Sequence, residues 1–129
     1  METYLRTAEA GDLPEASAYL ATGAVLLFPG GVRYRDLADL YSSPKRQYRA
    51  ITKTLDRFDV DEVEGVVAVH GTLRGENLQG VHFQSVRFID RFEFVDGLIT
   101  RQFVWNDLAS TGVLTAATPG ELPDGLRVD

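Results

Sequence analysis

A carboxylate lies in the middle of an aromatic stretch in the second half of the chain. The stretch is VRFIDRFEFVDGLITRQFVWND, residues 86–107, and the carboxylate is Asp90. Side chains alternate between the two faces of a strand. In a strand, the residues that share a face with Asp90 are Val86, Phe88, Phe92 and Phe94. Because an apolar face packs toward the core, we expect Asp90 to point inward.

An inward Asp90 can exist in two states. An ionised carboxylate in an apolar pocket is costly unless it has donors or a cationic partner. Without them it stays protonated, and a neutral carboxylic acid can donate a hydrogen bond to an oxyanion that develops on a substrate. The alternative is a structural Asp90 that accepts from backbone N–H groups or an arginine. The sequence leaves both interpretations open.

The next strand, residues 98–107, has one more polar and one more apolar face. The more polar set is Thr100, Gln102, Val104 and Asn106. The more apolar set is Ile99, Arg101, Phe103 and Trp105. Periodicity alone sends the apolar set inward, but a curved sheet can be apolar outside where it packs against a second subunit. We therefore expect Gln102, Val104 and Asn106 to line a pocket. Phe103 and Trp105 then form a homodimer interface, and the reverse assignment is the alternative.

The two histidines are weighed as possible bases. His70 shares a strand face with Ala68 and Thr72, so we expect it to face solvent. His82 follows the turn ENLQG and joins the face of Asp90 only if no bulge lies between it and Val86. It is the best candidate for a base, since imidazole ordinarily titrates near neutrality. The alternative is a surface histidine beside a turn.

Several elements must position these residues. A first helix is expected over 2–10, ended by Gly11, and a second from a capping Asp12 to Leu20. A short strand follows at 24–28 and a third helix at 34–43, limited by Pro44. Four strands then form an antiparallel meander, at 49–60, 66–75, 81–94 and 98–107. Helices on one face of a curved antiparallel sheet make an α+β domain with a pocket between the two layers. We expect this domain over 1–112 and an extended or frayed tail over 113–129.

Composition excludes several classes of function. The chain has 129 residues, enough for one domain, and a net charge of −6, which argues against nucleic-acid binding. It has no cysteine and two histidines, so we expect neither a metal site nor another cofactor. The N-terminus lacks the pattern of a signal peptide, and no apolar run is long enough to span a membrane. We therefore expect a cytoplasmic protein without a membrane partner.

Two segments resemble the nuclear transport factor 2-like superfamily, which includes ketosteroid isomerases, SnoaL-type polyketide cyclases and limonene epoxide hydrolase. AGDLPEASAYLATGAVLLFPGG is similar to its opening helix pair and strand, and VRFIDRFEFVDGLITRQFVWND to its closing hairpin. The resemblance covers residues 2–108. It implies a cone-shaped, cystatin-like fold in which a curved antiparallel sheet wraps three N-terminal helices.

The resemblance to ketosteroid isomerases implies roles for three positions. Tyr4 matches the helical tyrosine and Asp90 the strand aspartic acid that donate to the dienolate oxygen. The base that moves the proton should stand in LLFPGG, where this chain has Phe28. Phenylalanine cannot take up a proton, so steroid isomerisation by that route is not expected. For an arrangement like that of limonene epoxide hydrolase, the available charged residues are Asp107, Arg101 and Asp90.

We therefore expect a pocket for a small apolar molecule that carries one carbonyl, enol or phenol oxygen. The catalytic candidates are Asp90, Tyr4 and His82. The expected substrate-binding residues are Phe28, Val86, Phe88, Phe92, Gln102, Val104 and Asn106. One hypothesis is an isomerase, cyclase or dehydratase. The other is a non-catalytic ligand-binding or dimerisation module.

Overall fold

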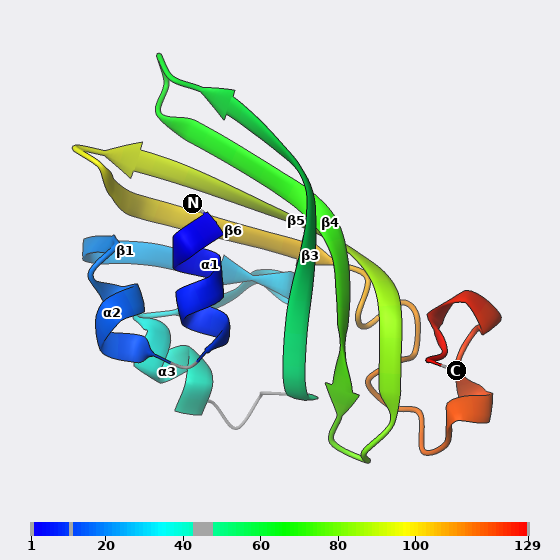
Figure 1. Cartoon of the computed structure of the whole chain (residues 1–129). Coiled ribbons are helices and arrows are strands. Elements are labelled where there is room, and N and C mark those ends of the chain that lie inside the picture. The colour runs from blue at the N-terminus through cyan, green and yellow to red at the C-terminus, as the bar shows by residue number, and fades with distance from the viewer. Residues whose placement is uncertain (1, 11, 43–47, 129) are drawn as a thin grey trace.

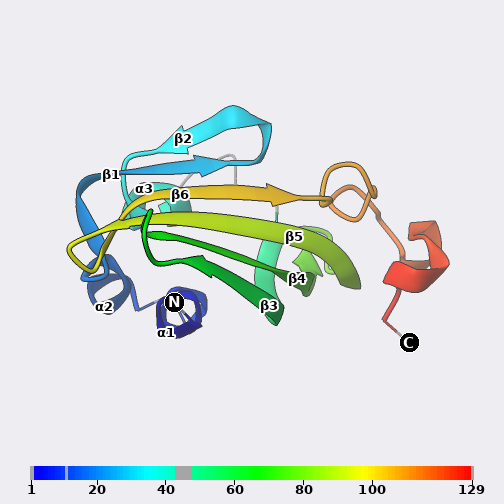
Figure 2. The ribbon, with the colours of Figure 1, turned by 90° about the horizontal axis from the view of Figure 1, so that it is seen from above.

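In the part of the chain that the structure describes, three helices lie on one side of a strongly curved sheet (Figure 1). The computed structural model describes residues 2–10, 12–42 and 48–128. The helices are α1 (Glu2–Glu9), α2 (Leu13–Ser17) and α3 (Leu37–Ser42). Figure 2 shows α1 and α2 on the same side of the sheet. The predicted α+β class, with its helices at the N-terminus, is confirmed.

Among the described residues, six strands form one mixed sheet. They are β1 (Leu20–Phe28), β2 (Val32–Tyr34), β3 (Tyr48–Asp61), β4 (Val66–Asn77), β5 (His82–Val95) and β6 (Leu98–Asn106). Their order across the sheet is β2-β1-β6-β5-β4-β3. The last four form the predicted antiparallel meander. The expectation of a wholly antiparallel sheet is wrong at one place, because β1 pairs with β6 in parallel. The chain enters β1 and β6 from the same end of the sheet.

The N-terminal elements differ in their bounds from the sequence prediction. Asp12 caps α2 as expected, since its Oδ1 accepts from the Glu15 N–H at 3.1 Å. That helix ends at Ser17 instead of Leu20, because β1 already begins at Leu20. The short strand β2 was not predicted, and it shortens the third helix at its start. The predicted stops at Gly11 and Pro44 lie outside the described residues.

Two glycines of β4 allow the sheet to curve. A Cβ built on Gly71 would lie 1.8 Å from the carbonyl oxygen of Thr54, and one on Gly75 would lie 2.1 Å from that of Ala50. The register of β3 against β4 also shifts between Leu55 and Arg57. Bulges and close backbone approach at glycine are how strands bend sharply. The bend brings the middle of β3 toward the helices.

The core lies between the helices and the concave face of the sheet. Helix α1 contributes Tyr4 and Leu5, and α2 contributes Ala16, all of them buried. The largest strand contribution comes from β5, with Phe83, Val86, Phe88 and Phe92. Among the described residues, no helix is both long and apolar enough to cross a membrane.

The C-terminal segment packs against the end of the sheet that lies far from the helices (Figures 1 and 2). It contains two short 3-10 turns, η2 (Pro119–Glu121) and η3 (Asp124–Leu126). Val113, Ala116 and Leu122 are buried, and Arg127 bridges to Phe83. The expectation of an extended or frayed segment is wrong for these residues. The division into 1–112 and 113–129 stays a prediction.

Candidate functional site

Asp90 lies at the centre of the concave face of the sheet. Its cross-strand neighbours are Val69 on β4 and Val104 on β6. Its exposed fraction is 0%, and the predicted face-mates Val86, Phe88 and Phe92 are buried with it. The strand alternation thus placed the carboxylate correctly.

Lys53 on β3 is the cationic partner of Asp90. Its Nζ donates to Asp90 Oδ2 in an ion pair, and the Lys53 side chain is 16% exposed. Of the two states expected for Asp90, the structure shows the one with a partner, but the partner is a lysine and not an arginine or a backbone amide. The interpretation of Asp90 as a neutral acid requires a carboxyl group without a charged neighbour, and Lys53 is such a neighbour.

The alternation of side chains in β3 indicates an inward Lys53, a position that is absent from the sequence-based predictions. The half-buried residues of this strand include Ile51, Lys53 and Leu55, while Thr52 and Thr54 between them are exposed. A lysine in phase with two aliphatic residues on an alternating strand points inward. A buried lysine needs an anion, and Asp90 is the carboxylate that β5 directs into the same interior.

The other oxygen of Asp90 has no partner among the described residues. Its Oδ1 is buried and accepts no hydrogen bond from any of them. Most buried polar atoms in proteins have at least one hydrogen-bond partner, and exceptions require an explanation. This atom is therefore an acceptor that faces the interior and is open to a donor from a bound molecule.

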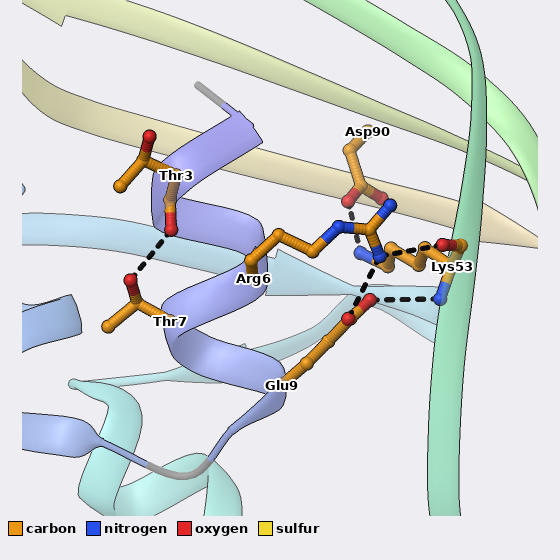
Figure 3. Close-up of polar contacts among 6 residues, drawn as sticks. All are labelled: Thr3, Arg6, Thr7, Glu9, Lys53 and Asp90. Atoms are coloured by element: carbon orange, nitrogen blue, oxygen red, sulfur yellow. Dashed lines mark hydrogen bonds and ion pairs between the residues drawn. The ribbon is translucent and has the colours of Figure 1, made fainter.

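Helix α1 binds both backbone polar groups of Lys53, the N–H and the C=O, at the outer edge of β3 (Figure 3). Arg6 donates through a guanidinium nitrogen to the Lys53 carbonyl oxygen at 2.8 Å. The Lys53 N–H donates to Glu9 Oε1 at 2.9 Å, and Arg6 and Glu9 are themselves paired at 3.0 Å. Strand β3 is at the edge of the sheet, so this N–H and C=O face away from β4. The two side chains of α1 satisfy them in place of a further strand.

The ammonium of Lys53 also lies over an aromatic ring. Its Nζ is 5.1 Å from the centroid of the Phe88 ring. A cation within about 6 Å of a ring face is attracted by the ring quadrupole. Phe88, one of the expected substrate-binding residues, thus contacts the ion pair directly.

Tyr4 is inside the core and forms a polar pair with Gln102. Its hydroxyl donates to Gln102 Oε1 at 2.9 Å, and its ring packs edge-on against Phe92 with centroids 6.0 Å apart. Gln102 is buried, as the pocket prediction required. The concave face thus carries two polar pairs, Tyr4 with Gln102 and Lys53 with Asp90.

The remaining expected substrate-binding residues are divided between core and rim. Val86, Phe92 and Val104 are buried in the concave face. Asn106 is half-buried, and its Oδ1 accepts from the Leu108 N–H at 3.1 Å, which closes the end of β6. Phe28 packs edge-on against Tyr34 with centroids 5.4 Å apart.

Two hollows lie elsewhere on the molecule. Phe28 lines one of about 140 Å³ together with Gly30, Val104 and Trp105. The second, of about 310 Å³, lies between β1 and the approach to α3. Neither includes Tyr4 or Asp90 in its lining.

His82 is exposed and does not join the face of Asp90. The residue between them that changes the phase is Ser85, whose φ is +62°, and the β4–β5 register shifts opposite it. The bulge sends Phe83 inward in place of His82. The expectation of His82 as the base beside Asp90 is therefore wrong in its geometry, whereas the solvent-facing His70 is confirmed.

The charges considered for an epoxide hydrolase arrangement are not brought together. Asp107 pairs with Arg87 at 2.7 Å, and Arg101 is exposed on the opposite face from Asp90. Over residues 2–10, 12–42 and 48–128, no group of three or more His, Asp or Glu side chains could hold a metal ion.

The convex face of the sheet carries exposed apolar side chains. Trp105 on β6 is 55% exposed and Ile89 on β5 is 49% exposed, and the two are cross-strand neighbours. Phe103 lies 6.1 Å from Trp105 between ring centroids. The predicted assignment of the β6 faces is confirmed for Gln102 and Val104 inside and Trp105 outside. Ile99 is the exception: it is buried, because the register shifts next to it.

Comparison with solved structures gives relatives of the same fold. An NTF2-like protein of unknown function from Burkholderia pseudomallei matches with a TM-score of 0.74 and 18% identity, over 88% of this chain and 92% of that one. A putative polyketide cyclase from Pseudomonas putida has a TM-score of 0.63 at 18% identity, over 81% and 86%. An epoxide hydrolase similar to limonene epoxide hydrolase, from M. tuberculosis, has a TM-score of 0.67 at 20% identity, over 88% and 85%.

Sequence comparison supports the same grouping. No curated protein sequence matches the chain. The family model of the SnoaL-like domain matches residues 1–102, which include every element from α1 through most of β6. This chain has the fold of NTF2-like proteins and belongs to the SnoaL-like domain family.

Proposed function

We propose that this protein binds a small apolar molecule with a polar oxygen group on the concave face of its sheet, at Asp90. One observation carries the proposal: a fully buried carboxylate oxygen, Asp90 Oδ1, has no donor among the described residues. Leaving a buried acceptor unsatisfied costs about 1–3 kcal/mol. A hydroxyl or enol group of a ligand satisfies it, and the aromatic rings of Phe88 and Phe92 contact the apolar part.

The same carboxylate can move a proton. Its Oδ1 has no donor among the described residues, so it is open to accept a proton from the hydroxyl or the acidic carbon of a ligand and to return it. That is the chemistry of an isomerase, cyclase or dehydratase, and the Pseudomonas putida neighbour is named as a putative polyketide cyclase. Phe28 is half-buried against Tyr34 and takes no part in this step.

A ligand reaches Asp90 between α1 and β3. Lys53 is the partly exposed member of the ion pair, so the route passes along its side chain. Tyr4 and Phe92 fill the deeper space, so a ligand must displace their side chains. The contacts that Arg6 and Glu9 make to the Lys53 backbone hold α1 against β3 beside this route.

Ligand binding and the rise in melting temperature that it causes test this proposal. We expect phenols and enolisable 1,3-diketones to bind the native protein and to raise its melting temperature. Asp90→Asn removes the charge at nearly constant shape, so binding should weaken at least tenfold. Asp56→Asn, on the exposed side of β3, is the matched control and should bind like the native protein. If Asp90→Asn and Asp56→Asn bind these compounds equally well, Asp90 is structural.

A second candidate function is a dimerisation module without catalysis, and the convex face favours it. Trp105 and Ile89 form an exposed apolar pair at the middle of that face. Burial of such side chains against a second copy removes apolar surface from water. We propose that the protein forms a homodimer through its convex face, whether or not a reaction takes place on the concave face.

Light scattering tests the dimer directly. The native protein should have the mass of a dimer at micromolar concentration, and Trp105→Glu should have that of a monomer. Val63→Glu, an equally drastic change at a residue that is exposed in the β3–β4 turn, is the control. If the native protein is a monomer at this concentration, the proposed homodimer is wrong.

A further inference from the structure

We infer that Lys53 is itself a ligand-binding residue and that the site recognises two adjacent oxygens. The inference rests on the proposed function at Asp90 and names its substrate class. The ligand has an O–H group and a second oxygen on neighbouring carbons, as in an α-hydroxy enone, an enediol or a catechol. The O–H donates to Asp90 Oδ1, and the second oxygen accepts from the Lys53 ammonium.

The donor inventory of Lys53 supports this assignment. An ammonium group has three N–H donors. Among the described residues one of them meets an acceptor, Asp90 Oδ2, and the group lies over the Phe88 ring. The Lys53 ammonium therefore has N–H donors left for a ligand. Beside it lies Asp90 Oδ1, which accepts no hydrogen bond from the described residues. The ion pair presents one donor and one acceptor to the same small volume.

The geometry of the pair sets the spacing of the ligand oxygens. Oδ1 and Oδ2 belong to one carboxylate, and Nζ binds Oδ2, so Nζ and Oδ1 are next to each other. A molecule with oxygens on adjacent carbons can close a ring of hydrogen bonds over them. A molecule with a single oxygen, or with two on opposite sides of a ring, satisfies only one of the two atoms.

The position of Lys53 is fixed by more than its ion pair. Arg6 and Glu9 bind the carbonyl and the N–H of this one residue, at 2.8 and 2.9 Å (Figure 3). These contacts satisfy the outward N–H and C=O of an edge strand, and they also hold Lys53 in place, which benefits a group that must meet a ligand oxygen. The contacts also link α1, beside which the ligand enters, to the residue that binds it.

The arrangement can support a complete proton transfer. With an enediol, Asp90 Oδ1 takes the proton of the ligand O–H; that O–H bond breaks and an O–H bond forms on Asp90. The enolate that results lies beside the Lys53 ammonium. Asp90 then returns the proton to the neighbouring carbon: the electron pair of the C=C bond forms the new C–H bond, the pair on the oxygen forms a C=O bond, and an enol-to-ketone tautomerisation is complete without any further reactant. The ammonium is placed where negative charge develops, which is the requirement for electrostatic stabilisation.

Three isomeric diols provide the test. Catechol, resorcinol and hydroquinone have the same atoms, but only catechol carries its oxygens on adjacent carbons. Binding is measured by calorimetry and by ultraviolet absorbance on the native protein, on two Lys53 variants and on one control variant. We expect the native protein to bind catechol about tenfold or more tightly than either isomer, the effect of one further hydrogen bond to a charged group.

Lys53→Arg and Lys53→Met should each abolish the preference for catechol. A guanidinium fork binds a carboxylate through both oxygens, so Lys53→Arg occupies Asp90 Oδ1 and keeps the charge of the pair. Lys53→Arg also provides the test if Lys53→Met fails to fold. Lys45→Arg changes a lysine that belongs to a different part of the sequence, and it should leave the preference unchanged.

The outcomes separate the two proposals. Equal binding of all three isomers to the native protein, or a catechol preference that survives in Lys53→Arg, overturns the inference and leaves Asp90 as the binding residue. Failure of every phenol and diol to bind the native protein overturns both. A preference for catechol that is lost in the Lys53 variants supports both.

Discussion

Asn77 is predicted to be the side chain that fixes the C-terminal segment to the sheet. It lies at the end of β4, with an exposed fraction of 0%. Its Nδ2 donates to the carbonyl oxygens of Val113 and Ala116, each at 2.9 Å. Its Oδ1 accepts from the N–H groups of Gln79 and Val81, each at 2.9 Å. Two of these four hydrogen bonds stay within the β4–β5 turn and two reach residues more than thirty positions along the chain, so one amide joins the two segments.

The cost of losing Asn77 follows from these four bonds. A buried hydrogen bond contributes about 1 kcal/mol net, and unsatisfied partners add a desolvation cost. Asn77→Ala should therefore lower the free energy of unfolding by about 4 kcal/mol. Asn77→Asp keeps the acceptor but loses both donors and sets a carboxylate against two carbonyl oxygens. It should be at least as damaging at neutral pH.

Urea denaturation followed by Trp105 fluorescence measures the loss. Limited proteolysis provides a second readout, because release of the segment exposes its backbone to cleavage. Gln79→Ala is the matched control, since Gln79 contributes only its backbone N–H to the cluster and its side chain is exposed. A loss below about 1 kcal/mol in Asn77→Ala, with cleavage of the segment unchanged, would refute the reasoning.

Two further predictions concern the concave face and the bend of the sheet. Tyr4→Phe removes the donor to Gln102 Oε1 and should cost about 1–3 kcal/mol, measured by thermal unfolding, because the amide oxygen is left buried. An unchanged stability shows that the bond does not contribute. Gly71→Ala should destabilise by about 1–3 kcal/mol or more in the same assay, because a Cβ there would lie 1.8 Å from the Thr54 carbonyl oxygen. Gly125→Ala, which meets nothing within 4 Å, should be neutral, and equal effects of the two changes contradict the steric explanation.

Local sequence pattern predicted the order of the helices and of the strands other than β2, and it predicted that Asp90 points inward. The alternation of aromatic residues in β5 and the turn residues that separate the last four strands are properties of short segments. Hydrophobic alternation selects the face of a strand without knowledge of the rest of the fold. The same is true of the Asp12 cap, which depends on residues three positions apart.

Tertiary structure decided which groups meet. Asp90 and Lys53 are separated by 37 positions in the chain, and only the bend of β3 around Gly71 brings the ammonium to the carboxylate. A bulge at Ser85 moved His82 to the outside, and a bulge depends on backbone geometry that residue type only weakly indicates.

Tertiary structure also decided two further features: the parallel pairing of β1 with β6 and the packing of the last residues. Neither has a local signature, because each joins segments that are distant in the chain. The sequence by itself therefore determined the fold class, the meander and an inward carboxylate, all of which follow from periodicity. Only the folded chain decided that this carboxylate is paired with Lys53 and keeps one oxygen open, because partners in a core are selected by the path of the backbone.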